Sequence, residues 1–281
     1  MVDRSQALVT YINGGSDAVE GWFFRLDMVL WAKLDAFQKA FGTVGDLCEV
    51  GVYKGKALAL LGMVARDQET IYGFDSYPND WLGETQKTMS AFCPWRSDIH
   101  YVQENTASLN SEALGRRFSN KLRLLHIDAG HEYHEVLHTL YLFAPFVAAE
   151  GVIVMDDYHD HEFPGVAAAT LDFCWNREIR PFVPFLAGAN KMYLCMPGLA
   201  ERYQLALLAQ PEFKDTMRLS RIRNDIVLVS GSREPMSSAG MQEVISRDTI
   251  ETAGETTLAM LATVAARNSQ SMGQASLSIR Q

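Results

Sequence analysis

Near the N-terminus, apolar residues recur at the spacing of an amphipathic helix. Between Gly21 and Phe41, large apolar side chains follow one another at steps of three and four positions: Phe23, Leu26, Leu30, Leu34, Phe37 and Phe41. This spacing places them on one face of a helix. Gly42 follows directly and ends the pattern. We therefore expect residues 1–44 to form a helical cap.

Further along the chain, short apolar runs alternate with helical patterns. The expected strands are Asp46–Val50, Thr70–Asp75, Ile99–Val102, Leu122–Asp128 and Gly151–Asp156. The expected helices between them are Lys56–Arg66, Trp81–Ser90, Asn110–Phe118 and Glu135–Val147. Repeated strand–helix units of this kind predict an α/β fold with an open, doubly wound, mostly parallel sheet that has helices on both faces.

The C-terminal third gives a weaker pattern. Arg180–Phe185 and Lys191–Met196 are separated by Leu-Ala-Gly-Ala-Asn and predict a β-hairpin that closes the sheet. Beyond Pro197 we expect a C-terminal extension, residues 198–281, with a helix, one more strand and another helix: Ala200–Gln210, Asp225–Ser230 and Thr249–Ala266. Ser, Thr, Ala, Gly and Met dominate after Gly231, so we expect a mobile end.

Composition narrows the class of protein. The net charge of -9 disfavours a nucleic-acid partner, which would require a basic face. No apolar run reaches the roughly 20 residues that cross a bilayer, and the first residues lack a signal-peptide layout. The four cysteines are widely spaced, as is typical of reduced thiols. We expect a cytoplasmic protein without a membrane partner, and the composition is compatible with a homo-oligomer.

The first expected strand leads into a glycine-containing turn. Glu49 lies at the end of this strand, and Gly51 and Gly55 follow as the chain enters a helix. Glycines allow the backbone to approach a ligand closely. The pattern ExGxxxG differs from the GxGxxG of dinucleotide sites. A carboxylate before the first glycine would repel a pyrophosphate but could bind the ammonium group of S-adenosylmethionine.

The ends of the next two strands supply further polar residues. Asp75 ends the second strand, at the position where a doubly wound sheet binds a ribose. A carboxylate there can accept hydrogen bonds from the ribose hydroxyl groups. A turn or helix-capping role is the alternative for Asp75. Glu104, Asn105 and Thr106 follow the third strand, at the expected position of an adenine edge.

Three carboxylates follow the fourth and fifth strands. Asp128 ends one strand, and Asp156 and Asp157 end the next. The carboxyl ends of parallel strands meet at one edge of a sheet, so these acids should converge. Close carboxylates repel one another unless a cation or protons intervene, and oxygen ligands suit Mg²⁺. The alternative is that the acid pair only caps the following segment.

Four motifs in this order resemble the class I S-adenosylmethionine-dependent O-methyltransferases: EVGVYKG, GFDSYP, HIDAGHEYHEV and GVIVMDDY. The chain is most similar to the catechol-type and macrolide-sugar-type metal-dependent enzymes, over roughly residues 45–197. The resemblance implies a seven-stranded sheet ending in a β-hairpin. It also implies a methyltransferase domain over 45–197 in which Glu49, Gly51, Tyr53 and Asp75 hold the cofactor. We expect the same cofactor site to include Gly55, Ser76, Asn105, Thr106 and Asp128.

The same resemblance implies a metal site and a catalytic base. Asp128, Asp156 and Asp157 match the positions that hold Mg²⁺ in the catechol-type enzymes, where the third ligand is Asn. His131 matches their catalytic lysine, and a histidine can accept a proton near neutral pH. His131 or Asp128 would then deprotonate an acceptor hydroxyl. His134 and His138 are expected to be surface or packing residues. One departure is Ala57, where such families often place a serine.

Three functions remain open from the sequence. The first is metal-assisted methyl transfer to a hydroxyl of a small molecule in a biosynthetic pathway, and it is the one we favour. The second is a metal-free class I methyltransferase that acts on nitrogen or oxygen. The third is a non-catalytic module that binds S-adenosylmethionine, which the intact acids at 49, 75 and 128 disfavour. A dehydrogenase is least compatible because GxGxxG is absent.

Overall fold

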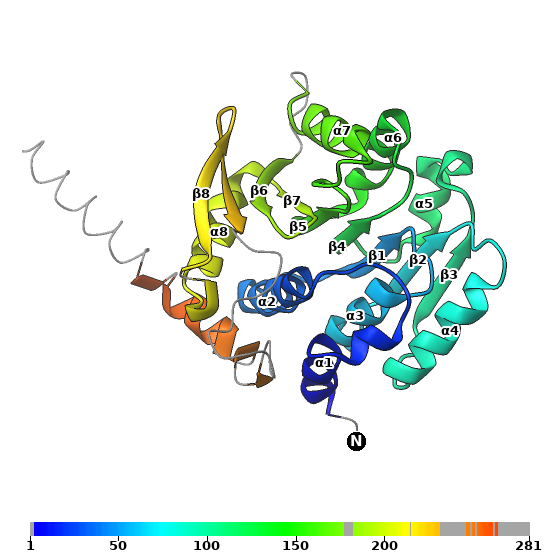
Figure 1. Cartoon of the computed structure of the whole chain (residues 1–281), viewed down its shortest axis with the longest axis horizontal. Helices are drawn as coiled ribbons and strands as arrows, with labels where there is room; N and C mark the ends of the chain where they lie inside the picture. The colour runs from blue at the N-terminus through cyan, green and yellow to red at the C-terminus, as the bar shows by residue number, and fades with distance from the viewer. Residues whose placement is uncertain are drawn as a thin grey trace, which may run out of the picture.

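One mixed sheet organises the described part of the chain, in the order β3-β2-β1-β4-β5-β7-β6-β9-β8 (Figure 1). The computed structural model describes residues 3–176, 182–213, 215–230, 246–247, 249–250, 252–260 and 262–263. The strands are β1 Asp46–Val50, β2 Ile71–Asp75, β3 Ile99–Gln103, β4 Leu122–Ile127, β5 Val147–Met155, β6 Val183–Ala187, β7 Met192–Cys195, β8 Met217–Ile222 and β9 Asp225–Ser230.

The sheet has nine strands among the described residues, and the prediction of seven is therefore wrong. Strands β1 to β5 pair in parallel, and β7 runs antiparallel to both β5 and β6. The two additional strands belong to the C-terminal extension. Strand β9 continues the sheet by pairing in parallel with β6, and β8 pairs antiparallel with β9 at the edge. Arg180 and Pro181, placed in a strand by the sequence pattern, lie outside the described residues.

Helices cover both faces of the sheet (Figure 1). They are α1 Arg4–Ile12, α2 Arg25–Phe41, α3 Lys56–Val64, α4 Trp81–Phe92, α5 Ser111–Arg117, α6 Tyr133–Phe143, α7 Pro164–Cys174 and α8 Ala200–Leu208. Short 3₁₀ helices are η1 Gly15–Ala18, η2 Thr106–Ser108, η3 Ala144–Phe146, η4 Pro197–Leu199 and η5 Pro211–Phe213. The sequence pattern did not predict α7. Helix α2 begins at Arg25 rather than Gly21, and it ends at Gly42, whose φ of 74° is left-handed.

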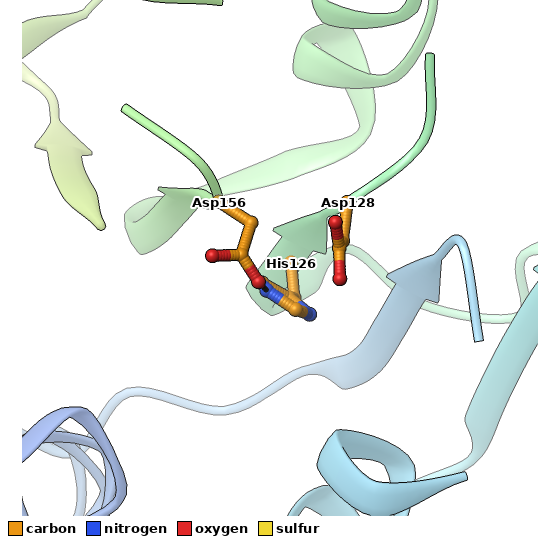
Figure 2. A group of neighbouring side chains, drawn as sticks. All are labelled: His126, Asp128 and Asp156. Atoms are coloured by element: carbon orange, nitrogen blue, oxygen red, sulfur yellow. Dashed lines mark ion pairs between the residues drawn. The ribbon is translucent and has the colours of Figure 1, made fainter. Parts of the chain in front are cut away.

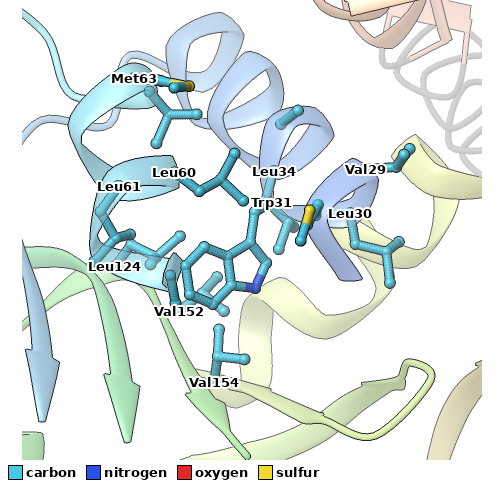
Figure 3. Packing of buried hydrophobic residues seen from close by; sticks show 14 of the residues in the cluster. Val29, Leu30, Trp31, Leu34, Leu60, Leu61, Met63, Leu124, Val152 and Val154 are labelled. Atoms are coloured by element: carbon cyan, nitrogen blue, oxygen red, sulfur yellow. The ribbon is translucent and has the colours of Figure 1, made fainter. Parts of the chain in front are cut away.

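Alternation along the central strands separates two cores. Leu124 of β4 and Val152 and Val154 of β5 face α2 and α3, where Trp31 fills the space between the layers (Figure 3). Their neighbours Leu125 and Ile153 belong to the other core, which includes α6 and α7. Successive strand residues point to opposite faces, so apolar side chains that point both ways bury both faces of the sheet.

The C-terminal extension contacts the N-terminal helices. Ala253 and Thr257 are buried, and the Lys33 ammonium of α2 donates to the Thr249 carbonyl oxygen at 2.5 Å. The division into a cap, a central domain and an extension remains our proposal. The segments 231–245 and 264–281, including the end of the helix expected over Thr249–Ala266 and the end expected to be mobile, lie outside the described residues. None of the described helices is long and apolar enough to span a membrane.

Candidate functional site

Gly51 lies where the ends of β1 and β4 come closest. Its amide donates to the Phe74 carbonyl oxygen at 2.8 Å, and the Asp128 amide donates to the Val50 carbonyl oxygen at 2.7 Å. The φ of Gly51 is 91°, and a Cβ at this position would lie 1.9 Å from the Asp128 carbonyl oxygen. A side chain cannot be accommodated there. The glycine thus brings the turn after β1 against the segment that carries Asp128.

Asp75, at the end of β2, holds this turn in shape. One carboxylate oxygen accepts the amides of Val52 at 2.8 Å and Tyr53 at 2.9 Å, and the other accepts the Tyr77 amide at 2.7 Å. Tyr53 has a left-handed φ of 53°, a conformation that these bonds help to maintain. The turn role that the sequence left open for Asp75 is therefore present. The Ser76 hydroxyl also donates to the second oxygen over a long 3.5 Å, so of about four acceptor positions three hold amides and the fourth holds only this weak bond, which a ligand hydroxyl could replace.

A cavity of about 540 Å³ opens beside this turn. Six of the nine residues expected to bind the cofactor line it: Gly51, Asp75, Ser76, Asn105, Thr106 and Asp128. Glu49, Tyr53 and Gly55 do not. His134, Glu135 and His138 of α6 complete its wall; the two histidines are exposed, as expected, but we did not predict that they line a cavity. The signal for their position was their spacing of four, which puts them on one side of a helix.

Glu49 is buried in β1 beside the cavity residues and has an unusual hydrogen-bonding state. Its Oε1 atom lies 3.0 Å from His126 Nδ1, while Oε2 has no hydrogen-bond partner. Burial raises the pKa of Glu49, and the nearby His126 opposes this rise. A buried acceptor without a partner is costly, so a donor from a ligand would be favourable here. An ammonium group fits this requirement.

The two adjacent acids after β5 point to different partners. Asp156 is almost fully buried, and its Oδ2 lies 3.3 Å from His126 Nε2 (Figure 2). Asp157 has a left-handed φ of 53°; its Oδ1 accepts from Asn190 Nδ2 at 2.9 Å, and its Oδ2 lies 3.0 Å from His131 Nε2. Because the backbone turns at Asp157, the Asp156 and Asp157 side chains point in different directions. The three acids expected to hold a metal therefore do not all face the same partners.

His131 lies at the outer side of this cluster. Its ring stacks on Phe163 with centroids 4.1 Å apart, and its Nε2 is 4.0 Å from an Asp128 oxygen. The contact with Asp157 raises the pKa of His131 and partial burial opposes the rise, which makes the imidazole a stronger base. Burial and the nearby Asp156 carboxylate raise the pKa of Asp128. Both expected proton acceptors therefore lie within the same acid cluster.

Lys191, directly before β7 in the β6–β7 hairpin, was not recognised from the sequence as a site residue. Its ammonium contacts the Asp156 carboxylate and lies 3.2 Å from His126 Nε2. Burial disfavours the ammonium form, but the carboxylates of Asp156, Asp128 and Asp27 raise the pKa of Lys191. Burial also opposes ionisation of Asp156, but Lys191 and His126 lower its pKa. Asp156 is therefore an ionised partner of a buried cation.

The donor atoms fit a divalent cation at Asp128 and Asp157. Two groups with ligand atoms within 4.8 Å of one another occur among the described residues, and both include Asp128. One adds His126 and Asp156, and the other adds His131 and Asp157. Carboxylate oxygens are ligands that Mg²⁺ accepts, with water completing its octahedron. Asp156 fits the same ion only if the Lys191 ammonium moves away from it.

Comparisons with known proteins place the central part of the chain in a domain family. Residues 48–158 match the family described as a methyltransferase domain. The O-methyltransferase NovP is 16% identical, with a TM-score of 0.53 over 69% of this chain and 99% of that chain. The calicheamicin methyltransferase CalS11 is 15% identical, covering 60% and 78% of the two chains with a TM-score of 0.48. The S-adenosylhomocysteine-bound methyltransferase PaMTH1 of Podospora anserina is 14% identical, covering 68% and 87%, with a TM-score of 0.47.

No curated protein sequence matches the chain. The matched segment nevertheless runs from within β1 through β5 and includes the residues that line the cavity. The likeness to NovP shows a common fold at this level of identity. The chain therefore resembles the class I S-adenosylmethionine-dependent methyltransferases, as its sequence motifs indicated.

Proposed function

We propose that this S-adenosylmethionine-dependent methyltransferase moves a methyl group to a hydroxyl oxygen of a small molecule with the help of a divalent cation, Mg²⁺ in the first instance. The observation that carries the proposal is the position of Asp128. It lines the cavity beside Asp75 and also belongs to both acid groups at the carboxyl ends of β4 and β5, which we call the rim: His126, Asp128, His131, Asp156 and Asp157. One residue thus joins the space for a nucleoside to the groups that handle a proton and a cation.

The cavity supports the assignment of the cofactor. Asp75 and Ser76 would hold the ribose, Asn105 and Thr106 the adenine edge, and Glu49 the ammonium group of the amino-acid end. Gly51 and Gly55 would shape the turn, and Tyr53 would flank the methionine end of the cofactor. The unpartnered Oε2 atom of Glu49 supports its role, because a buried carboxylate oxygen is stabilised by a charged donor.

We expect Asp75→Ala to weaken the binding of S-adenosylhomocysteine at least tenfold. The change removes the ribose acceptor and also the bonds to the Val52 and Tyr53 amides that shape the turn. Isothermal titration calorimetry measures the dissociation constant. Asp80→Ala is a matched control, because Asp80 follows the same strand but does not line the cavity. Unchanged affinity in Asp75→Ala would show that the ribose binds elsewhere.

The residues of the rim can perform the proton transfer that the reaction requires. S-adenosylmethionine supplies a methyl group on a positively charged sulfur, and a divalent cation lowers the pKa of a hydroxyl group that it binds. His131, or Asp128, accepts the proton of the acceptor hydroxyl as the oxygen attacks the methyl carbon; the methyl carbon–sulfur bond breaks, its electron pair stays on sulfur, and neutral S-adenosylhomocysteine leaves. Asp156 is buried, whereas Asp128 is partly exposed at the cavity, where substrates that fill the space would be aligned with it.

Removal of divalent cations tests the metal-assisted reaction. We expect excess EDTA to lower methyl transfer from methyl-labelled S-adenosylmethionine at least tenfold across a panel of sugars, phenols and polyketide alcohols, and added Mg²⁺ to restore it. The measurement is transferred label per unit time. A desalted sample without EDTA controls for loss of protein. Full turnover in EDTA would favour the metal-free methyltransferase.

The non-catalytic module remains as a second function for this cavity. Binding of S-adenosylhomocysteine without methyl transfer to oxygen or nitrogen acceptors would favour it. The paired surroundings of His131 oppose it, because Asp157 increases the basicity of a histidine that a binding module would not need.

A further inference from the structure

Lys191 is a buried cation inside the acid rim. Its side chain is 2% exposed, and its ammonium lies 4.8 Å from the centre of the Phe23 ring. The groups that face it are the Asp156 carboxylate, the His126 ring, and at longer range Asp128 and Asp27. Asp27 is itself buried and accepts from the Tyr193 hydroxyl at 2.7 Å. The ammonium is thus enclosed by an aromatic ring, an imidazole and acids from α2, β4 and the end of β5.

Such an ammonium is not an incidental surface charge. Burying an ammonium group away from water is strongly unfavourable unless opposite charges lie close to it. The Asp156 carboxylate offsets this desolvation by direct contact, and it therefore already has one cation bound. The neighbouring Asp157 has no lysine partner in the described structure; it accepts a hydrogen bond from Asn190 and lies within ion-pair distance of His131. The two acids of the pair therefore differ in their readiness to bind a further cation.

We propose that the Lys191 ammonium occupies the Asp156 carboxylate and so competes with a divalent ion for it. The ion then binds through Asp128 and Asp157, and Asp156 becomes a ligand only when the ammonium is displaced. The proposal rests on the proposed metal-assisted function and adds a residue that sets the affinity for the metal. Lys191 is a positioning residue: it acts through Asp156 and lies on the hairpin beside Asn190, which orients Asp157. The hairpin turn thereby directs both acids.

The proposal predicts that loss of the ammonium increases metal affinity. In Lys191→Met the side chain keeps its length and apolar stem but releases Asp156 as a third carboxylate ligand. We expect the dissociation constant for Mn²⁺, measured by calorimetry on the full chain without cofactor, to fall at least tenfold. Lys87→Met is the matched control, because Lys87 is an exposed lysine paired with Glu84, and we expect no change there.

A charge-balanced variant keeps the test valid if Lys191→Met alone does not fold. The double variant Asp27→Asn, Lys191→Met removes one buried acid together with the buried cation, and Asn can still accept from the Tyr193 hydroxyl. We expect the same tenfold gain in Mn²⁺ affinity. We also expect 1 mM Mn²⁺ to raise its melting temperature more than that of the wild type, a readout independent of activity.

Asp156→Asn completes a cycle that separates the proposal from its alternatives. In the wild-type background we expect it to change the Mn²⁺ dissociation constant less than threefold, and beside the Lys191 substitution we expect it to cancel the gain. No gain in either lysine variant, or a tenfold loss in Asp156→Asn alone, overturns the proposal. If the lysine variants bind Mn²⁺ and the wild type does not, the result supports the role of Lys191 but contradicts the metal-assisted function.

Discussion

Gly51→Ala is expected to lower the free energy of unfolding by about 3 kcal/mol or more and to abolish measurable binding of S-adenosylhomocysteine. The new Cβ would lie 1.9 Å from the Asp128 carbonyl oxygen and 3.1 Å from the Ala129 Cβ, on a backbone with φ of 91°. The clash is with main chain, so rotation of a side chain cannot relieve it. The ends of β1 and β4 must separate, and this separation deforms the cavity wall. Urea denaturation and calorimetry measure the two effects.

Gly42→Ala provides the matched control for this prediction. Gly42 also has a left-handed φ, 74°, but a Cβ there would meet no atom within 4 Å. Its substitution should cost only the strain of the left-handed conformation, roughly 1–2 kcal/mol, and leave cofactor affinity unchanged. If both variants lost similar stability and both bound the cofactor, the close approach at Gly51 would have no functional role.

Asp128→Asn is expected to lower the rate of methyl transfer by about 10² to 10⁴-fold. Asparagine keeps the shape of the side chain but removes the negative charge that both acid groups share. It also removes the basicity that burial and Asp156 increase in the carboxylate. Cofactor affinity should fall less than tenfold, because Asp75, Ser76 and the other cavity residues are unchanged. Single-turnover transfer to an acceptor found in the panel measures the rate.

Asp160→Asn is the control for loss of a nearby negative charge. Asp160 lies three residues beyond Asp157, and its carboxylate accepts the Glu162 amide at 2.8 Å outside both acid groups. We expect its rate to stay within threefold of the wild type. A wild-type rate in Asp128→Asn would exclude Asp128 from proton transfer and from metal binding.

Local patterns predicted much of the central fold. The alternation of apolar runs and helical segments gave β1 to β5 because their side chains bury both faces of a parallel sheet. Strand β8 escaped prediction because it lies at the edge, where Arg218 and Leu219 are exposed and no buried face imposes an apolar pattern. The start of α2 was placed too early because aromatic residues before Arg25 continue the apolar spacing without continuing the helix.

The candidate site shows the same limit. Asp75 and Asp128 were predicted to lie close together because each follows a strand of one parallel sheet, and both line the cavity; Glu49, predicted on the same ground, is buried and does not line it. Lys191 was missed because its partner, Asp156, is 35 residues away across an antiparallel pairing that no local pattern specifies. The divergence of Asp156 and Asp157 depends on the left-handed backbone at Asp157, which the sequence does not reveal.

A crystal structure of the chain with S-adenosylhomocysteine and Mg²⁺ tests the central claim most directly. The account predicts adenosine density in the cavity with its ribose at Asp75, the amino group at the Oε2 atom of Glu49, and metal density at Asp128 and Asp157. Nucleoside density at another surface, or a ligand amino group far from Glu49, would contradict it.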